Sequence, residues 1–302
     1  MGLSVATFNV ENLLDAPGAR SAPLLARKLE ALAAKVVACD ADVVGLQEIG
    51  SSALLARLVA RVGGGYGAPV EGTRDARGIG CALLSRVPVR EARVHTTGAL
   101  SFPVFRAGDP PPFGARIPLR RGIVHARVEA PGLGDVDVLV AHFKSARPVL
   151  LEDASGGTVP ARSARARAEG ALRSLVWRTA EALFVRGLVD GVLAARPGAL
   201  AAVVGDLNDT PDSRVVRTLL GEGDAALRDC TAGVDAAARY STLHEGRGVQ
   251  IDHVLATPGL HARLVSARFL NEDLRDHGQL PETGDEALTA DSDHAPLVVR
   301  FA

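Results

Sequence analysis

The sequence predicts a single α+β domain in which many short strands alternate with only a few helices. Short apolar runs of β type, separated by glycine, proline and charged residues, recur along the whole chain, whereas helical periodicity is confined to a few segments. This pattern argues against a parallel sheet built from regular strand–helix–strand units. Two long polar or proline-rich stretches, residues 101–118 and 271–291, have strands on both sides that need partners, so we interpret them as surface loops. Although 302 residues could form two small domains, we expect one domain over residues 1–302.

The N-terminal half contains two helices between strands. Residues 4–10 form an apolar, strand-like run, and Leu25, Leu29, Leu32 and Val36 then follow at the spacing of an amphipathic helix. A second helix is expected around residues 53–62. The other short apolar runs of this half predict strands over residues 42–47, 79–85, 87–95, 123–129 and 136–143.

The C-terminal half begins with a long helix. Residues 163–195 are rich in Ala, Arg, Leu and Glu, and Pro197-Gly198 ends this helix. A strand over residues 200–204 leads through a turn to a helix for which Thr210 is the expected N-cap and Pro211 the first residue. The remaining strands are expected over residues 249–256, 264–270 and 296–301.

Composition describes an ordinary globular enzyme, with 47% apolar and 23% charged residues. The net charge of −1 shows no basic excess that would indicate a nucleic-acid partner, although a local basic cleft can still attract phosphate. The three cysteines, Cys39, Cys81 and Cys230, are too widely spaced for a disulfide framework or a zinc site and are interpreted as packing residues in a reducing compartment.

The chain shows no targeting or anchoring signal. No apolar run reaches membrane-spanning length, and the first residues lack the basic and apolar regions of a signal peptide. We therefore expect a cytoplasmic protein without a membrane anchor, secreted only if a signal peptide precedes this sequence. No protein partner can be inferred, and a monomer is expected.

Acidic, amide and imidazole side chains stand at the ends of apolar strands throughout the chain. If these ends converge, they form one cleft that holds several carboxylates, which a cation would have to neutralise. Oxygen-rich ligation without cysteine favours Mg²⁺ or Mn²⁺ over zinc. The residues concerned are Asn9, Glu11, Glu48, His142, Lys144, Asp206, Asn208, Asp209, Asp252, Asp293 and His294.

Each of these residues has a simpler structural explanation when it is considered alone. Asn9 could bond backbone groups at a strand end, His142 could be a core histidine, and Asp206 with Asn208 would suit any Asx-turn that leads into a helix. These separate explanations do not account for six such polar motifs occurring together in one order along the chain.

The series FNVEN, QE, HFKS, GDLND, IDHV and SDHAP resembles the endonuclease/exonuclease/phosphatase family, which includes deoxyribonuclease I. The resemblance extends from Ser4 to the C-terminus. It implies a four-layer α/β/β/α sandwich of two mostly antiparallel sheets flanked by helices, with the active site at one end. It also implies a metal-dependent phosphoric ester hydrolase.

The resemblance also implies roles for individual residues. Glu48 matches the principal metal ligand, and Asn9, Glu11 and Asp293 match its neighbours. Asp206 matches the residue that activates water, and Asn208 would hold the phosphate or that carboxylate. His142 and His294 are the imidazoles, and Asp252 fixes the tautomer of His294. Whether Asp206 or His294 is the base stays open. These groups suit in-line attack of water on a phosphodiester.

Departures from family patterns narrow the branch. The chain has His142 in AHFK where abasic-site endonucleases carry a Tyr-x-Pro-Asn type motif, which makes a role at abasic sites doubtful. The GDLNDTPDS segment is closer to deadenylases and bacterial nucleases of the family than to inositol phosphatases.

Arginines near two strand ends could contact phosphates beside the scissile one. The candidates for these contacts are Arg120, Arg121 and Lys144, although a solvated, salt-bridged helix start would explain both groups of basic residues equally well. With 4% aromatic residues, no base-stacking platform is evident. The wider groups also include Arg116, Arg147, Arg162, Arg165 and Arg167.

Three functional hypotheses follow. The first is a nuclease that cleaves DNA or RNA. The second is a hydrolase of a small phosphoester, such as a phospholipid headgroup, an inositol phosphate or a nucleotide. Salt dependence would separate these two, because backbone contacts make polymer binding steeply salt-dependent. The third is an inactive binding module, which the intact set of candidate catalytic residues disfavours.

Overall fold

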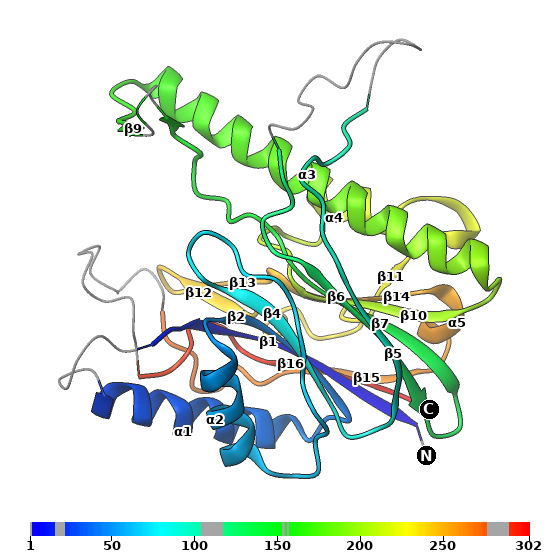
Figure 1. The fold of residues 1–302 in the computed structure, drawn as a ribbon. Coiled ribbons are helices and arrows are strands. Elements are labelled where there is room, and N and C mark those ends of the chain that lie inside the picture. Colours follow the sequence, from blue (N-terminus) through cyan, green and yellow to red (C-terminus); the bar gives the residue numbers. More distant parts are fainter. Residues whose placement is uncertain (1, 16–21, 104–116, 153–154, 156, 277–289) are drawn as a thin grey trace.

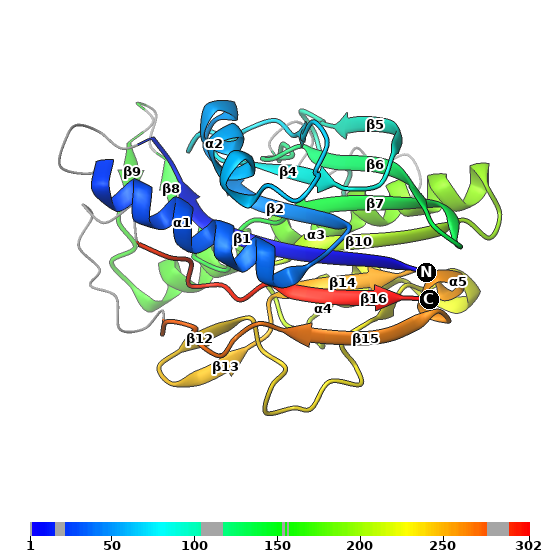
Figure 2. The same ribbon diagram turned by 90° about the horizontal axis from the view of Figure 1, so that it is seen from below.

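The computed structural model describes residues 2–15, 22–103, 117–152, 155, 157–276 and 290–302. These residues form four layers, with two helices on one side, two six-stranded sheets face to face, and two further helices on the other side (Figures 1 and 2). Each six-stranded sheet has one parallel strand pair, and its other pairs are antiparallel. The predicted α/β/β/α sandwich is therefore confirmed.

The first sheet contains the N-terminal strand at its centre. Its order is β15 (Leu264–Phe269), β16 (Leu297–Phe301), β1 (Leu3–Leu13), β2 (Val43–Ile49), β4 (Gly80–Ser85) and β3 (Val70–Glu71). The helices α1 (Ala22–Cys39) and α2 (Ser52–Val62) cover its outer face through the apolar stripe that the sequence predicted.

The second sheet has the order β11 (Arg228–Asp229), β14 (Asp252–Ala256), β10 (Leu200–Asp206), β7 (Gly134–His142), β6 (Ile123–Ala130) and β5 (Val89–His95). The helices α3 (Ala164–Ala195) and α4 (Arg214–Leu220) cover its outer face. Alternate residues of both sheets, for example Val5 and Val204, point inward and make the central core. The short elements outside these layers are β8 (Leu151–Glu152), β9 (Thr158–Val159), β12 (Thr242–His244), β13 (Arg247–Val249), a 3₁₀ turn (Gly223–Ala225) and α5 (Pro258–His261).

Two predicted elements differ from the structure. The N-cap of α4 is Ser213, whose hydroxyl accepts a hydrogen bond from the amide of Val216, so Thr210 belongs to the preceding turn. The run over residues 249–256 is interrupted because the amides of Ile251 and Asp252 donate to the Ser241 hydroxyl instead of to a strand. The predicted loops lie mostly outside the described residues, in 104–116 and 277–289. None of the described helices combines the length and the apolar character that crossing a membrane requires.

Candidate active site

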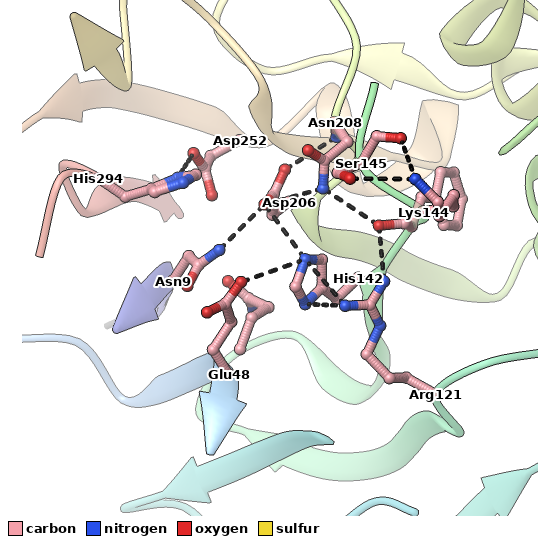
Figure 3. A network of polar contacts seen from close by, with 12 residues as sticks. Asn9, Glu48, Arg121, His142, Lys144, Ser145, Asp206, Asn208, Asp252 and His294 are labelled. Atoms are coloured by element: carbon pink, nitrogen blue, oxygen red, sulfur yellow. Dashed lines mark hydrogen bonds and ion pairs between the residues drawn. The ribbon is translucent and has the colours of Figure 1, made fainter. Parts of the chain in front are cut away.

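The polar strand ends converge at one end of the sandwich, between the two sheets (Figure 3). In the first sheet, parallel β1 and β2 pair Asn9 with Gln47, which brings Glu48 beside Asn9. In the second sheet, parallel β7 and β10 pair His142 with Asp206, and antiparallel β14 places Asp252 on the other side of Asp206. Parallel neighbours end at the same edge, so both parallel pairs deliver their polar ends to one site.

Backbone strain concentrates at the same place. Among the described residues, six non-glycine residues have positive φ, and four of them belong to this site: Glu11 (47°), Asn12 (48°), Glu48 (67°) and Asn208 (52°). Strand pairing is irregular at the first three, because the β1–β2 register shifts between Asn9 and Leu13 and the β2–β4 register shifts between Leu46 and Ile49. Such conformations cost about 1–3 kcal/mol each and typically accumulate at functional sites.

Asp206 is the centre of the hydrogen-bond network. Its Oδ2 accepts from the amide groups of Asn9 (3.0 Å) and Asn208 (3.1 Å) and lies 3.4 Å from Nε2 of His142. Its Oδ1 accepts from the backbone amide of Asn208 at 2.8 Å. Burial and the neighbouring Asp252 carboxylate raise the pKa of Asp206 to about 7. Its charged form is therefore destabilised first by burial and then by repulsion from Asp252.

His142 lies between Asp206 and a buried arginine. Nη1 of Arg121 is 3.2 Å from Nδ1 and 3.3 Å from Nε2 of His142, and Nη2 donates to the carbonyl of Phe143 at 2.9 Å. Burial and the Arg121 charge hold the pKa of His142 well below its ordinary value. His142 is thus a neutral imidazole that can donate one hydrogen bond into the site.

His294 is oriented by Asp252, as predicted for the pair. Nδ1 of His294 is 2.7 Å from Oδ2 of Asp252. Burial lowers the pKa of His294, but the charges of Asp252, Asp293 and Asp206 and the hydrogen bond to Asp252 outweigh burial, so the pKa stands well above its ordinary value. With Nδ1 engaged, only Nε2 is available for a substrate.

Glu48 and Glu11 have different surroundings. Oε2 of Glu48 accepts from the amide of Asn12 at 2.7 Å, and Oε1 lies 3.8 Å from Nε2 of His142. Oε2 of Glu11 is 2.7 Å from Arg275 and 3.8 Å from the buried ammonium of Lys28. Burial lowers the pKa of Lys28 to about 8, although Glu11 counteracts this shift. That oxygen of Glu11 is therefore committed to an ion pair, and the prediction that Glu11 binds metal stays untested.

The donor set fits a hard divalent cation. Its members are carboxylate and amide oxygens, and Asp252 Oδ1 is buried without a hydrogen-bond donor among the described residues. A cation would relieve the repulsion between the buried Asp206 and Asp252 carboxylates. Within the described ranges, no three Asp, Glu, His or Cys side chains are close enough to hold an ion alone. A cation held by Glu48 would thus complete its shell with Asn9, water and phosphate oxygens.

The three predicted substrate-binding residues are placed differently from one another. Lys144 is buried, and its ammonium donates to the Ser145 carbonyl, the Ser145 hydroxyl and the Arg147 carbonyl, so it holds its own loop instead of facing a substrate. Arg121 is also buried and braces His142. Of these three residues, only Arg120 is half-buried. Its guanidinium carbon lies over the Trp177 ring, 5.1 Å from the ring centroid.

One of the other arginines mentioned in the sequence analysis has the simpler explanation. Arg165 is 89% exposed at the start of α3 and pairs with Glu169, which is the salt-bridged helix start considered as the alternative. Arg116 lies outside the described residues.

Several supporting residues were not predicted. The buried Ser292 hydroxyl donates to the Asn9 carbonyl (2.7 Å) and accepts from the His294 amide (3.0 Å), so it ties the segment that leads into β16 to the end of β1 within the first sheet. Glu181 of α3 accepts from the Lys144 amide at 2.6 Å. Ser292 could have been suspected from its place in the SDH tripeptide. Nothing in the sequence marks Glu181, because its partner is brought near only by folding.

Comparisons with known proteins agree with this geometry. A sequence model described as the Endonuclease/Exonuclease/phosphatase family matches residues 6–294. No curated protein matches the sequence significantly.

Solved structures share the fold. Truncated TDP2 of Caenorhabditis elegans is 18% identical with a TM-score of 0.60, over 99% of this chain and 96% of that chain. The mannosyl-6-phosphatase Bt3783 of Bacteroides thetaiotaomicron VPI-5482 is 19% identical, with a TM-score of 0.62 over 99% of both chains. An AP endonuclease from Archaeoglobus fulgidus is 17% identical, with a TM-score of 0.60 over 99% of both. At these identities the likeness is one of fold.

Proposed function

Because this chain belongs to the endonuclease/exonuclease/phosphatase family, whose members hydrolyse phosphate esters, we propose that it is a divalent-metal-dependent phosphodiesterase that cleaves nucleic acid. We also propose that residues 1–302 form one catalytic domain. The observation that carries the proposal is the buried convergence of Glu48 from one sheet with His142, Asp206 and the Asp252–His294 pair.

The residues suit in-line attack of water on phosphorus. Among the described residues, Oδ1 of Asp206 accepts one hydrogen bond, from the backbone amide of Asn208, which leaves a lone pair for a water molecule, while Asn9 and Asn208 fix its other oxygen. We therefore assign proton abstraction to Asp206. His294, whose Nδ1 is held by Asp252, presents Nε2 to the phosphate, and neutral His142 donates a hydrogen bond to a phosphate oxygen.

Mg²⁺ or Mn²⁺, held by Glu48 with Asn9 beside it, would neutralise charge that develops on the phosphate oxygens. Asp293 and Glu11 are proposed to support this ion. Asp293 lies 3.9 Å from Nε2 of His294, and its amide donates to Glu11 at 3.2 Å.

Support for a nucleic-acid substrate comes from the site's own motifs and from Arg120. The GDLNDTPDS segment resembles the bacterial nuclease and deadenylase branches, and the histidine of HFKS is the residue that departs from abasic-site endonucleases. Arg120 lies half-buried over Trp177, and burial together with the Arg120 charge lowers the pKa of Lys144 to about 8. A flanking phosphate could contact Arg120 while Arg121 supports the scissile position.

A small phosphoester is the second candidate, and one observation favours it. Arg121 and Lys144 point into the protein, so fewer cations face a polymer than the sequence suggested. The protein named a mannosyl-6-phosphatase has the same fold.

Substrate class is tested by activity with Mg²⁺ or Mn²⁺ on plasmid DNA, oligoribonucleotides, sphingomyelin, inositol phosphates and bis-(p-nitrophenyl) phosphate. The Arg120→Glu variant is expected to weaken polymer cleavage more than cleavage of the small diester, with a shallower salt dependence. Arg90→Glu, on the edge strand β5, is the matched charge-reversal control. Turnover of a lipid or inositol phosphate with no cleavage of DNA or RNA would establish the second candidate instead.

A further inference from the structure

A cavity lined by charged and imidazole side chains together with an apolar helix face lies on the outer face of the second sheet, away from the active site. It measures about 260 Å³ and is enclosed by β5, β6, β7 and the C-terminal part of α3. Asp137, on its floor, precedes His142 by five residues on β7, which is roughly 17 Å along a strand. The cavity is smaller than the roughly 300–1,000 Å³ of typical small-molecule sites, so its occupant would be a small group. We call it the relay cavity.

A chain of three polar side chains forms its floor. Nε2 of His125 is 2.8 Å from Oδ1 of Asp137, and Nε2 of His95 is 3.1 Å from Nδ1 of His125. Burial raises the pKa of Asp137, but the hydrogen bonds from His125 and Arg196 outweigh burial, so the pKa is lowered. The ionised carboxylate has no proton to donate and acts only as a hydrogen-bond acceptor. His125 therefore carries its proton on Nε2 and accepts from His95 through Nδ1, which leaves the lone pair of His95 Nδ1 for a donor.

Three guanidinium groups surround this floor, against two carboxylates. Arg93 and Arg127 pair with Glu91, and Arg196 pairs with Asp137. Nε of Arg127 is buried and has no hydrogen-bond partner among the described residues, because Asp137 is 3.6 Å away. With neutral histidines, the lining carries one surplus positive charge. Burial, together with His125 and Arg93, lowers the pKa of His95 and keeps it neutral.

Two glycines on α3 keep the cavity open. Gly187 and Gly191 stand one helical turn apart on its rim, and a Cβ atom at either would meet nothing within 4 Å. Each glycine costs the helix about 1 kcal/mol relative to alanine. Close packing does not require them, so their effect is to leave room beside the arginines.

From the relay, the surplus charge and the open rim we propose that the relay cavity binds a singly protonated terminal phosphate group, either as inorganic phosphate or at the end of a nucleotide. Its charged oxygens contact the guanidinium groups, as tetrahedral oxyanions do. The P–OH group, present in HPO₄²⁻ and in the monoanion of a nucleoside monophosphate, donates to Nδ1 of His95, which a sulfate dianion or a carboxylate cannot do. The alternative hypothesis is a metal ion bound between His95 and His125. The ring centroids are 5.4 Å apart with planes 27° from parallel, so the rings meet edge to edge as in a hydrogen bond, and their lone pairs do not converge on an ion.

The test is histidine ¹⁵N–¹H NMR of the full chain without added divalent cation, titrated with inorganic phosphate, a nucleoside monophosphate or sulfate. Phosphate is expected to shift the His95 and His125 signals, and sulfate to bind about two- to tenfold more weakly, the value of one hydrogen bond. Signals of His142 and His294 report the active site separately. Equal binding of phosphate and nucleotide supports a site for the phosphate group alone, and tighter nucleotide binding identifies the nucleotide as its source.

Gly191→Leu should abolish the His95 and His125 shifts while unfolding no more easily than the wild type, because leucine is the better helix former. Ala194→Leu, exposed on the same helix and outside the cavity lining, is the matched control and should leave the shifts intact. The proposal is overturned by unmoved His95 and His125 signals in phosphate, by sulfate binding as tightly as phosphate, or by shifts that persist in Gly191→Leu. Saturation of both rings by Zn²⁺ without any response to phosphate would establish the metal instead.

Discussion

Replacing Glu181 by glutamine tests how the helix layer supports the active-site edge. The Glu181 side chain is buried below α3, where Oε2 accepts from the Lys144 amide and Oε1 has no hydrogen-bond partner among the described residues. Burial raises its pKa from 4.5 to about 7, although the nearby Arg121 and the Lys144 hydrogen bond act in the opposite direction.

The size and sign of the effect follow from this pKa. Between pH 4.5 and about 7 the folded protein binds a proton that the unfolded chain has lost, so stability falls as the pH rises through this window. Above about 7 the cost is constant. At about 1.4 kcal/mol for each pH unit of separation, the loss attributable to Glu181 is at most about 3–4 kcal/mol.

The measurement is the free energy of unfolding in urea, from about pH 5 to about pH 8. Glu181→Gln should remove this part of the pH dependence, because glutamine does not titrate. The absolute stability of the variant can also change, because a buried amide without a hydrogen-bond partner costs about 1–3 kcal/mol. Glu169→Gln, at a half-exposed position of the same helix, should keep the wild-type slope. If Glu181→Gln also keeps that slope, the carboxylate is charged at no cost and the reasoning from burial is wrong.

Three further predictions concern the site and the strand that carries it. Glu48→Gln should bind Mg²⁺ far more weakly by calorimetry while keeping its circular dichroism spectrum; unchanged metal affinity would remove Glu48 from the metal site. Asp252→Asn should lower kcat by on the order of 10²–10⁴, as loss of a positioned proton-transfer group does, because His294 loses its orientation; full activity would contradict the pairing. Gly205→Ala should cost at least about 2 kcal/mol in thermal unfolding, since its φ is +144° and its Cβ would lie 1.8 Å from a backbone oxygen, whereas Gly187→Ala should cost nothing; equal stability of the two variants would refute the clash.

Local pattern was sufficient to place most of the helices and longer strands. The stripe through Leu25, Leu29, Leu32 and Val36 forms the buried face of α1, because helical periodicity and burial are properties of the local chain. Strands of two or three residues, such as β3 and β11, were not predicted, because so short a segment cannot show the alternation of apolar and polar residues that marks a strand. The N-cap of α4 was misplaced because several consecutive polar residues could each cap a helix, and only the backbone geometry selects Ser213.

For the candidate site, the sequence by itself determined which side chains stand at strand ends, since those positions follow from where each apolar run stops. Only the tertiary structure decided how these ends meet. Two parallel pairs set Glu48 beside Asn9 and His142 opposite Asp206, pairings that depend on contacts between distant segments. The same long-range packing directs the Lys144 ammonium to carbonyl groups of its own loop and buries the Arg121 guanidinium against His142. Two positive charges that the sequence assigned to substrate binding therefore make contacts inside the protein.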